Sequence, residues 1–571
     1  MQNRHSLLCL AIAFFSTSLK AQTTYLPLWS KEGWLLDRLE IKAQSNNSLN
    51  LSTVKPYMRM AYVAEGDSIR HKLISGANPL NLSKVDQYNL GRFLVNSKEY
   101  LEMNGDSDLM GMEGVPPIPA NFRNRSNLLE LNKDGFFMAV NPALSIQQSR
   151  ESDYDDPVYF RAIGANVRGL IDQKVGFNVQ VTANSEAGPL QFRRLFNLTN
   201  AVPGTVKYNA KNDSTQFSYV DFRGSINWNV TRYINMQFGH DQHFIGNGYR
   251  SLYLGNFSAP ATFFKINTRI WKLNYTNLYT RFAATPSKGL NDLYKQKYSS
   301  MHHLSVNLTK WLTVGGFESI IFARDNGYDF SYLLPVIFLR SIEQQNGSPD
   351  NANLGFDIKA NILKKLQVYG VLMLDEFKKD ELVGESRYWW GNKQAYQVGA
   401  KYVDAFGIAN LDLQAEFNQV RPFMYQFRDT TGAYTHALQP LAHPMGGNLR
   451  EILGVARFQP TPRLYLHARL NLWKQGLDSA GYNFGANPNE LYNSVSNGGT
   501  RPRDDNFPML SGMPASGVNA AFTASYELIE NMFFDLNASF RSFDEQDKPK
   551  VNTSVFTLGF RWNMFRKDYD Y

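Results

Sequence analysis

Three segments of the sequence combine side chains that can recognise sugars. Guanidinium groups, carboxylates and amides hydrogen-bond hydroxyl groups, and aromatic rings cover the apolar face of a sugar ring. The candidate residues are Arg387, Tyr388, Trp389 and Trp390, then Asp325 and Tyr328, and then Arg421 and Tyr425. Residues 387–390 are the best of these, because two adjacent tryptophans on an extended chain point opposite ways and cannot both serve one interfacial belt. Taken singly, each residue is more often an interface anchor or a solvated loop charge.

A fourth segment, residues 239–260, is rich in glycine, histidine and asparagine and begins at the end of an expected strand. Its central residues are Gly246, Asn247, Gly248, Tyr249, Arg250 and Ser251. Glycine permits positive φ and a close approach of backbones, so the segment can fold inward and constrict or line the mouth of a barrel. A loop packed for structural reasons fits the same composition equally well.

Catalytic and metal chemistry find little support. His240, His243, His302 and His303 with Ser251 supply acid, base and nucleophile, but no Gly-x-Ser-x-Gly turn occurs. His302 and His303 are neighbours in an expected strand and face opposite ways, so they cannot share one metal ion. The only cysteine, Cys9, lies in a removable N-terminal segment. We therefore expect no enzyme, no cofactor and no metal site.

The N-terminus has the pattern of a secretory signal peptide. Arg4 and His5 precede an apolar stretch at residues 7–15, and residues 16–21 are small and polar. The apolar stretch is far shorter than the roughly 20 residues of a spanning helix. We expect residues 1–21 to be removed after Ala21 and the chain to be exported.

From residue 135 onward the apolar residues recur with period two, which predicts strands. For example, Leu411, Leu413, Ala415 and Phe417 alternate with Asp412, Gln414, Glu416 and Asn418. Strands are expected to begin near residues 136, 158, 174, 217, 232, 261, 273, 300, 311, 353, 366, 394, 408, 448, 462, 516, 531 and 551. Very short turns alternate with long connections, as the periplasmic turns and external loops of an outer-membrane barrel do. The pattern predicts an all-β fold, an antiparallel transmembrane barrel of about eighteen strands over residues 135–571.

Composition agrees with a barrel in a membrane. Aromatic residues make up 14% of the chain while mean hydropathy is only −0.37, as expected when only alternate residues face lipid. A soluble sandwich or propeller is disfavoured, because the expected strands are about twice the usual length of soluble strands and their ends are rich in Trp and Tyr. The net charge of +8 is spread along the chain and indicates no nucleic-acid partner.

Residues 22–134 are expected to form a small periplasmic or plugging segment. Ser83 and Asp86 resemble a capping box before a helix near residues 83–102, and the proline-rich residues 104–125 form a linker. Charges on the lumenal face of the strands are expected to pair inside the barrel. They include Asp221, Arg223, Asp357, Lys359, Asp412, Glu416, His467 and Arg469. Residues 566–571 are either a tail or the end of the last strand.

Residues 239–260 resemble the signature of the Wzi-type capsule assembly family. Further resemblance lies in Leu35-Leu36-Asp37-Arg38-Leu39, Leu339-Arg340-Ser341, Asp350-Asn351-Ala352-Asn353-Leu354-Gly355 and Leu374-Asp375-Glu376-Phe377. The chain is most similar to the branch called gliding motility protein RemB in gliding bacteria. The resemblance implies an eighteen-stranded outer-membrane barrel with a helical plug that holds capsular polysaccharide as a lectin. Enterobacterial members carry a more aromatic, proline-containing central motif, so their glycan specificity does not transfer.

The resulting hypothesis is an outer-membrane barrel that binds and retains surface polysaccharide through its external loops. A motility-associated protein scaffold and a porin-like channel are the alternatives, and an open lumen would favour the channel. The expected partners are outer-membrane lipid, surface polysaccharide and, during biogenesis, the barrel-assembly machinery. The protein is expected to act as a monomer.

Overall fold

The computed structural model describes residues 23–101, 126–152, 154–172, 174–211, 215–289, 292–325, 327–336, 338–375 and 388–571. The expected signal peptide, the expected linker 104–125 and Arg387 lie outside these residues. None of the helices that the structure describes is long and apolar enough to cross a membrane.

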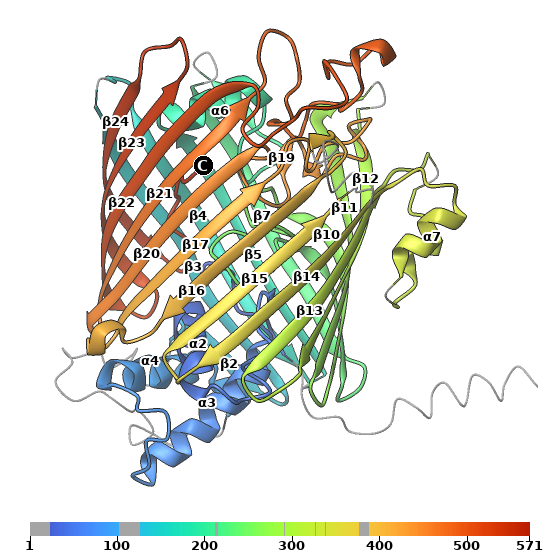
Figure 1. Cartoon of the computed structure of the whole chain (residues 1–571). Helices are drawn as coiled ribbons and strands as arrows, with labels where there is room; N and C mark the ends of the chain where they lie inside the picture. The colour runs from blue at the N-terminus through green and yellow to red at the C-terminus, as the bar shows by residue number, and fades with distance from the viewer. Residues whose placement is uncertain are drawn as a thin grey trace, which may run out of the picture.

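Eighteen long antiparallel strands close a barrel within the described residues (Figure 1). They are β3 (Phe136–Glu151), β4 (Val158–Ile171), β5 (Val175–Ala187), β7 (Gln216–Asn229), β8 (Ile234–Asp241), β10 (Ala261–Ile270), β11 (Leu273–Lys288), β12 (Tyr294–Asn307), β13 (Leu312–Phe322), β14 (Asn351–Ile362), β15 (Leu366–Leu374), β16 (Gln394–Tyr402), β17 (Leu411–Val420), β20 (Leu449–Thr461), β21 (Leu464–Leu477), β22 (Met513–Ile529), β23 (Met532–Glu545) and β24 (Val551–Trp562). Pairing of β24 with β3 closes the ring. The predicted fold and strand number are confirmed.

The two faces of the wall differ as the alternation predicts. On β14, Phe356 and Ile358 point outward and are exposed, whereas Asn353, Asp357 and Lys359 point inward and are buried. Outward-facing residues of other strands are likewise large, apolar and exposed, for example Ile163 and Leu558. Such a wall suits hydrocarbon outside and a polar interior.

The N-terminal residues form a helical domain at the end of the barrel where the short turns lie (Figure 1, blue). Its helices are α2 (Glu32–Ala43), α3 (Arg59–Ile74) and α4 (Lys84–Val95), followed by a 3-10 helix at Lys98–Tyr100. Ser83 and Asp86 form the capping box of α4, which satisfies donors at its first turn. The helix ends at Val95 rather than near residue 102, because a short 3-10 turn replaces its last expected turns.

Four segments from distant parts of the chain enter the lumen. Strand β1 (Val54–Lys55) of the N-terminal domain pairs with β9 (Phe244–Ile245), which follows β8. A hairpin of two short strands, β18 (Thr435–His436) and β19 (Gln439–Pro440), also lies inside, and the Ala437 N–H in its turn donates to the Ala283 carbonyl of the wall. After β24 the chain turns back, so residues 563–571 are a tail whose end lies inside the barrel (Figure 1).

Candidate functional site

The segment that contains β9 folds into the barrel and is held by the N-terminal domain. The Gly246 N–H donates to the Thr53 carbonyl at 2.9 Å. Thr53 Oγ1 donates to Asn247 Oδ1 at 3.0 Å, and the Asn247 amide reaches Asp357 on the wall at 3.4 Å. The segment therefore joins the N-terminal domain to the barrel interior. We call residues 244–260 the inward segment.

One carboxylate of the wall fixes the turn of the inward segment. Glu416 of β17 accepts the backbone N–H of Tyr249 at 2.8 Å and that of Arg250 at 3.2 Å. The Tyr369 hydroxyl donates to the same carboxylate at 2.8 Å. A Cβ atom at Gly248 would lie 2.2 Å from Glu416 Oε2, so this turn requires glycine for close approach.

The side chain of Arg250 connects the inward segment to the C-terminal tail. Its guanidinium lies 3.4 Å from Glu451 and 3.1 Å from Asp570. Arg469 donates to the Tyr249 hydroxyl at 2.7 Å and lies 3.4 Å from Asp570. Burial alone would raise the pKa of Asp570, but the charges of Arg250 and Arg469 outweigh it and lower that pKa to about 2. These contacts hold the segment inside the barrel, and its role as a constriction or as a lining of the mouth stays a prediction.

Ion pairs attach the N-terminal domain to the wall. Arg38 of α2 lies 2.7 Å from Asp86 of α4 and 2.9 Å from Asp404 in a turn, and it also pairs with Asp412 of β17. Further pairs join Lys31 to Glu530, Arg92 to Glu530, Lys359 to Glu40, and Lys401 to Asp37. The wall's own charges pair as expected, for example Asp221 with Arg223 at 3.0 Å.

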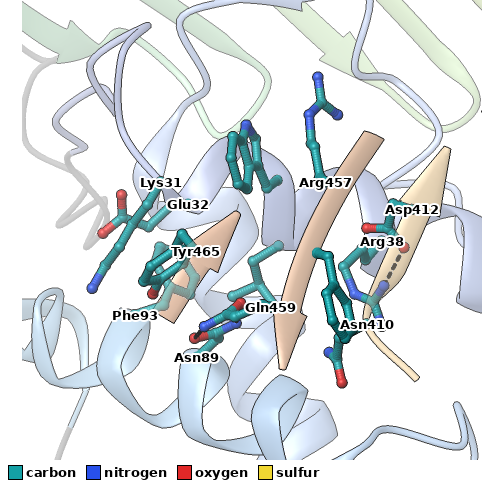
Figure 2. Close-up of a pocket in the computed structure, with 13 residues that line it drawn as sticks. Lys31, Glu32, Arg38, Asn89, Phe93, Asn410, Asp412, Arg457, Gln459 and Tyr465 are labelled. Atoms are coloured by element: carbon teal, nitrogen blue, oxygen red, sulfur yellow. Dashed lines mark hydrogen bonds and ion pairs between the residues drawn. The ribbon is translucent and has the colours of Figure 1, made fainter. Parts of the chain in front are cut away.

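The interface between the domain and the barrel is tightly packed. Figure 2 shows Arg38 and Asp412 joined across it, with Asn89 of α4 facing Gln459 of β20. The two amides bond reciprocally at 2.8 and 3.1 Å. The space left between these residues is about 30 Å³, which holds little more than one water molecule.

A larger cavity of about 550 Å³ remains between residues 26–34 of the N-terminal domain and the inward segment. Its lining is strongly charged and includes Lys55, Arg457, Asp37 and Asp570. Burial lowers the pKa of Lys55 to about 8. The described segments thus divide the lumen and leave a polar chamber within it.

The tryptophan segment lies at the other end of the barrel, among the long loops. Trp389 and Trp390 occupy a turn, and their ring centroids are 5.5 Å apart. The expectation that they point opposite ways is therefore wrong, because the chain here is not extended. Trp390 also packs against Tyr492 at 4.8 Å, and the Arg501 guanidinium stacks over its ring at 4.2 Å.

The other sequence candidates lie in three places. Arg421 is buried and donates to the Asn392 carbonyl at 2.8 Å, and it shares Phe507 with Tyr388, whose carbonyl accepts the Phe507 N–H. Tyr425 is buried deeper, bonded to the Leu252 carbonyl of the inward segment at 3.3 Å. Asp325 is exposed on a different loop, and Tyr328 packs on the outer wall against Phe322.

The structure thus brings Tyr388, Trp389, Trp390 and Arg421 together but leaves Asp325, Tyr328 and Tyr425 apart. It adds Lys393, Tyr492 and Arg501, which sequence reasoning missed. Lys393 lies 4.3 Å from the Tyr492 ring centroid. Residues this far apart in the chain are brought together only by the packing of long loops, and no local sequence pattern predicts that packing. We call Trp389, Trp390, Tyr492 and Arg501 the tryptophan cluster.

No protein-family model and no curated protein sequence matches this chain. The fold is similar to that of Wzi, described as a carbohydrate binding beta-barrel of the outer membrane involved in group 1 capsule assembly in Escherichia coli. That similarity has 12% identity and a TM-score of 0.52, over 95% of this chain and 100% of that chain. Pseudomonas aeruginosa OprD and Acinetobacter baumannii OccAB2 each align at 10% identity with a TM-score of 0.40, over 74% of this chain and 94% and 98% of theirs.

The similarity to Wzi extends over the whole length of that protein and concerns the fold alone. The shared fold is a barrel of the type that crosses the outer membrane. The similarity to Wzi therefore agrees with the architecture derived from the alternation of the strands.

Proposed function

We propose that this protein is an outer-membrane barrel that retains surface polysaccharide at the tryptophan cluster. The observation that carries the proposal is the stack of Arg501 on Trp390, with Trp389 and Tyr492 beside it. These three aromatic rings are half-buried, so part of each ring remains available to a sugar. Arg501 pairs with Asp504 beside them, which places charged hydrogen-bonding groups at the edge of the rings.

Two further observations support this proposal over a channel. The N-terminal domain lies against one end of the lumen, the inward segment and the C-terminal tail lie within it, and all three bond to the barrel wall. A solute path would need several of these buried ion pairs to open. The cluster lies at the end of the barrel away from the N-terminal domain, which is the cell-surface end if residues 1–21 direct export.

The finer assignments belong to the same proposal. The similar fold of a carbohydrate-binding barrel and the resemblance of residues 239–260 favour capsular polysaccharide as the ligand class. Membership of the RemB-type branch, a role in gliding motility, assembly by the barrel-assembly machinery and action as a monomer are parts of the hypothesis that need separate tests.

Binding to polysaccharide extracted from the protein's own cell surface tests the proposal. We expect saturable binding by the detergent-purified barrel, loss of binding in Trp389→Ala/Trp390→Ala, and no change in Trp271→Ala. Trp271 is an exposed tryptophan in the turn between β10 and β11, so it controls for loss of a tryptophan elsewhere. A folded barrel that binds none of this polysaccharide would contradict the proposal and favour a protein scaffold.

A further inference from the structure

A polar cluster lies on the outer face of the barrel wall, where lipid-facing residues are expected. Register pairs His302 of β12 with Glu318 of β13, and Glu318 in turn with Leu354 of β14. Leu354 belongs to the same face as Phe356, which is 60% exposed. The neighbours His303 and Asp357 bond to each other inside the barrel. His302 and Glu318 therefore point away from the lumen.

These outward-facing polar groups are nevertheless completely covered. His302 is 0% exposed and Glu318 is 2% exposed. His302 Nδ1 lies 3.0 Å from Glu318 Oε1 and 3.2 Å from the Tyr275 hydroxyl. The cover is the connection between β13 and β14, which contains the 3-10 helix Phe330–Leu333 and α7 (Leu339–Gln345). Figure 1 shows α7 outside the barrel, beside its wall. We call residues 327–336 and 338–345 the outer-wall loop.

The wall supplies hydrogen bonds to the backbone of this loop. Glu318 accepts the N–H groups of Phe338 at 2.8 Å and Leu339 at 2.9 Å. Tyr279 donates to the Leu333 carbonyl at 3.1 Å, and Ser300 donates to the Tyr332 carbonyl at 2.7 Å. A loop in water needs no such partners, but backbone in hydrocarbon must be satisfied by protein. Glu318, Tyr279 and Ser300 thus supply the hydrogen-bond partners that water supplies to an exposed loop.

Apolar contacts hold the loop to the same outer face. Tyr332 and Leu339 of the loop form one buried cluster with Ile320 and Phe322 of β13. Ile320 pairs with Ala352, so both residues belong to the outward face of the sheet. The loop therefore lies where other parts of the wall would contact lipid.

The part of the loop that precedes α7 presents large apolar side chains on its free side, whereas the exposed residues of α7, such as Arg340 and Gln344, are polar. Phe330 is 80% exposed, Phe338 68%, Val336 49% and Leu334 47%. Four such residues in nine positions are more than scattered surface apolar residues explain. Phe338 bonds through its backbone to Glu318, which pairs with Leu354, two positions from the exposed Phe356 on the same face of β14.

We propose that the part of the outer-wall loop that precedes α7 is inserted into the membrane, with Phe330, Leu334, Val336 and Phe338 in contact with lipid acyl chains. The chain then returns to the bilayer after leaving β13, and the polar cluster of the wall makes this possible by satisfying its backbone. The inference rests on the membrane location in the proposed function and is independent of glycan binding.

Spin labels at single cysteines test the proposal, since the only cysteine of the chain, Cys9, lies in the expected signal peptide. Nitroxides are placed at Phe330→Cys and Leu334→Cys in the barrel reconstituted into phosphatidylcholine vesicles. Phe356→Cys is the lipid-facing reference, and Asp325→Cys, exposed just before the loop, is the aqueous reference. Collisions with oxygen report hydrocarbon, and collisions with a nickel chelate report water. Heat-modifiable migration on gels identifies the folded variants.

We expect the oxygen-to-nickel collision ratio at Phe330 and Leu334 to match that at Phe356 and to exceed that at Asp325 by about tenfold, because a charged chelate is excluded from hydrocarbon. Ratios like that of Asp325 at both loop positions, with Phe356 still in lipid, would overturn the proposal while leaving the membrane barrel intact. A water-exposed Phe356 would instead overturn the membrane location itself.

Discussion

Replacing Arg38 with methionine is expected to release the N-terminal domain from the barrel. Arg38 contacts Asp86 inside the domain and both Asp404 and Asp412 on the barrel. Its side chain is only 7% exposed, and that of Asp86 is fully buried. Methionine keeps the length and apolar stem of arginine, so the change removes the charge with little loss of packing.

The size of the effect follows from the carboxylates left behind. Removing one partner of a buried ion pair costs about 3–5 kcal/mol. Lys42 remains 2.9 Å from Asp86 and 2.7 Å from Asp404, so the lower end of that range applies. A cost of about 3 kcal/mol shifts the docking equilibrium about a hundredfold toward the released state.

Amide hydrogen exchange across α2, α4 and β1 measures this shift. We expect faster exchange at β1 and β9, whose pairing depends on docking, and unchanged exchange in β20 to β23. Arg70→Met is the matched control, because Arg70 lies 2.8 Å from Asp67 of the same helix, α3, and the change removes an ion pair inside the domain. The double variant Arg38→Met/Asp412→Asn should recover part of the protection, since it removes the carboxylate that loses its ion pair with Arg38 while Lys42 stays paired with Asp86 and Asp404. Unchanged exchange at β1 in Arg38→Met would refute the reasoning.

Three further predictions concern the same interior. Burial alone would raise the pKa of Asp37 and of Asp86, but Lys401 lowers the first to about 2 and Arg38 lowers the second to about 2. Both values lie below the ordinary value of about 3.9. Docking measured by exchange should therefore persist at pH 5 and be lost as pH falls from about 4 to 2. Burial lowers the pKa of Lys55 to about 8, so the charged form of this lysine destabilises the fold below that pH. Lys55→Met should raise the melting temperature at pH 7, and this gain should shrink as pH rises toward about 10.4. An equal gain at pH 7 and pH 11 would contradict this. Gly248→Ala should cost about 1–3 kcal/mol by displacing Glu416, whereas Gly454→Ala, which meets no atom within 4 Å, should leave the melting temperature unchanged.

The strands could be predicted because their signal is local. Each strand meets lipid on one face and a polar lumen on the other, so apolar and polar residues alternate along every stretch of about ten residues. Helix α4 was found for a similar reason, since its capping box lies within four residues. The errors at strand starts, such as Tyr294 against an expected 300 for β12, occur where strands extend into loops and no longer meet lipid.

Helices α2 and α3 had no such signal. In α2 the apolar residues Leu35, Leu36 and Leu39 pack in the core of the domain. Buried charged residues flank them, with Arg38 and Lys42 on one side and Glu40 on the other. Charges on both sides of the apolar stripe weaken the contrast between an apolar and a polar face by which helices are recognised. Only the two tryptophans of the tryptophan cluster were predicted from the sequence. Tyr492 and Arg501 lie about a hundred residues after Trp390 in the chain, and only the packing of the loops brings them into contact with it.

Breaks in the alternation carry information of their own, and β13 shows why. Phe317 faces the lumen, yet it is apolar because it stacks on Tyr253 of the inward segment at 4.3 Å. The next residue, Glu318, faces outward, yet it is charged because it bonds to the outer-wall loop. Both residues depart from the alternation of polar inward and apolar outward residues, and in both cases another part of the chain replaces lipid or water as the neighbour. On β13 these two adjacent departures therefore coincide with a strand that is covered on both faces.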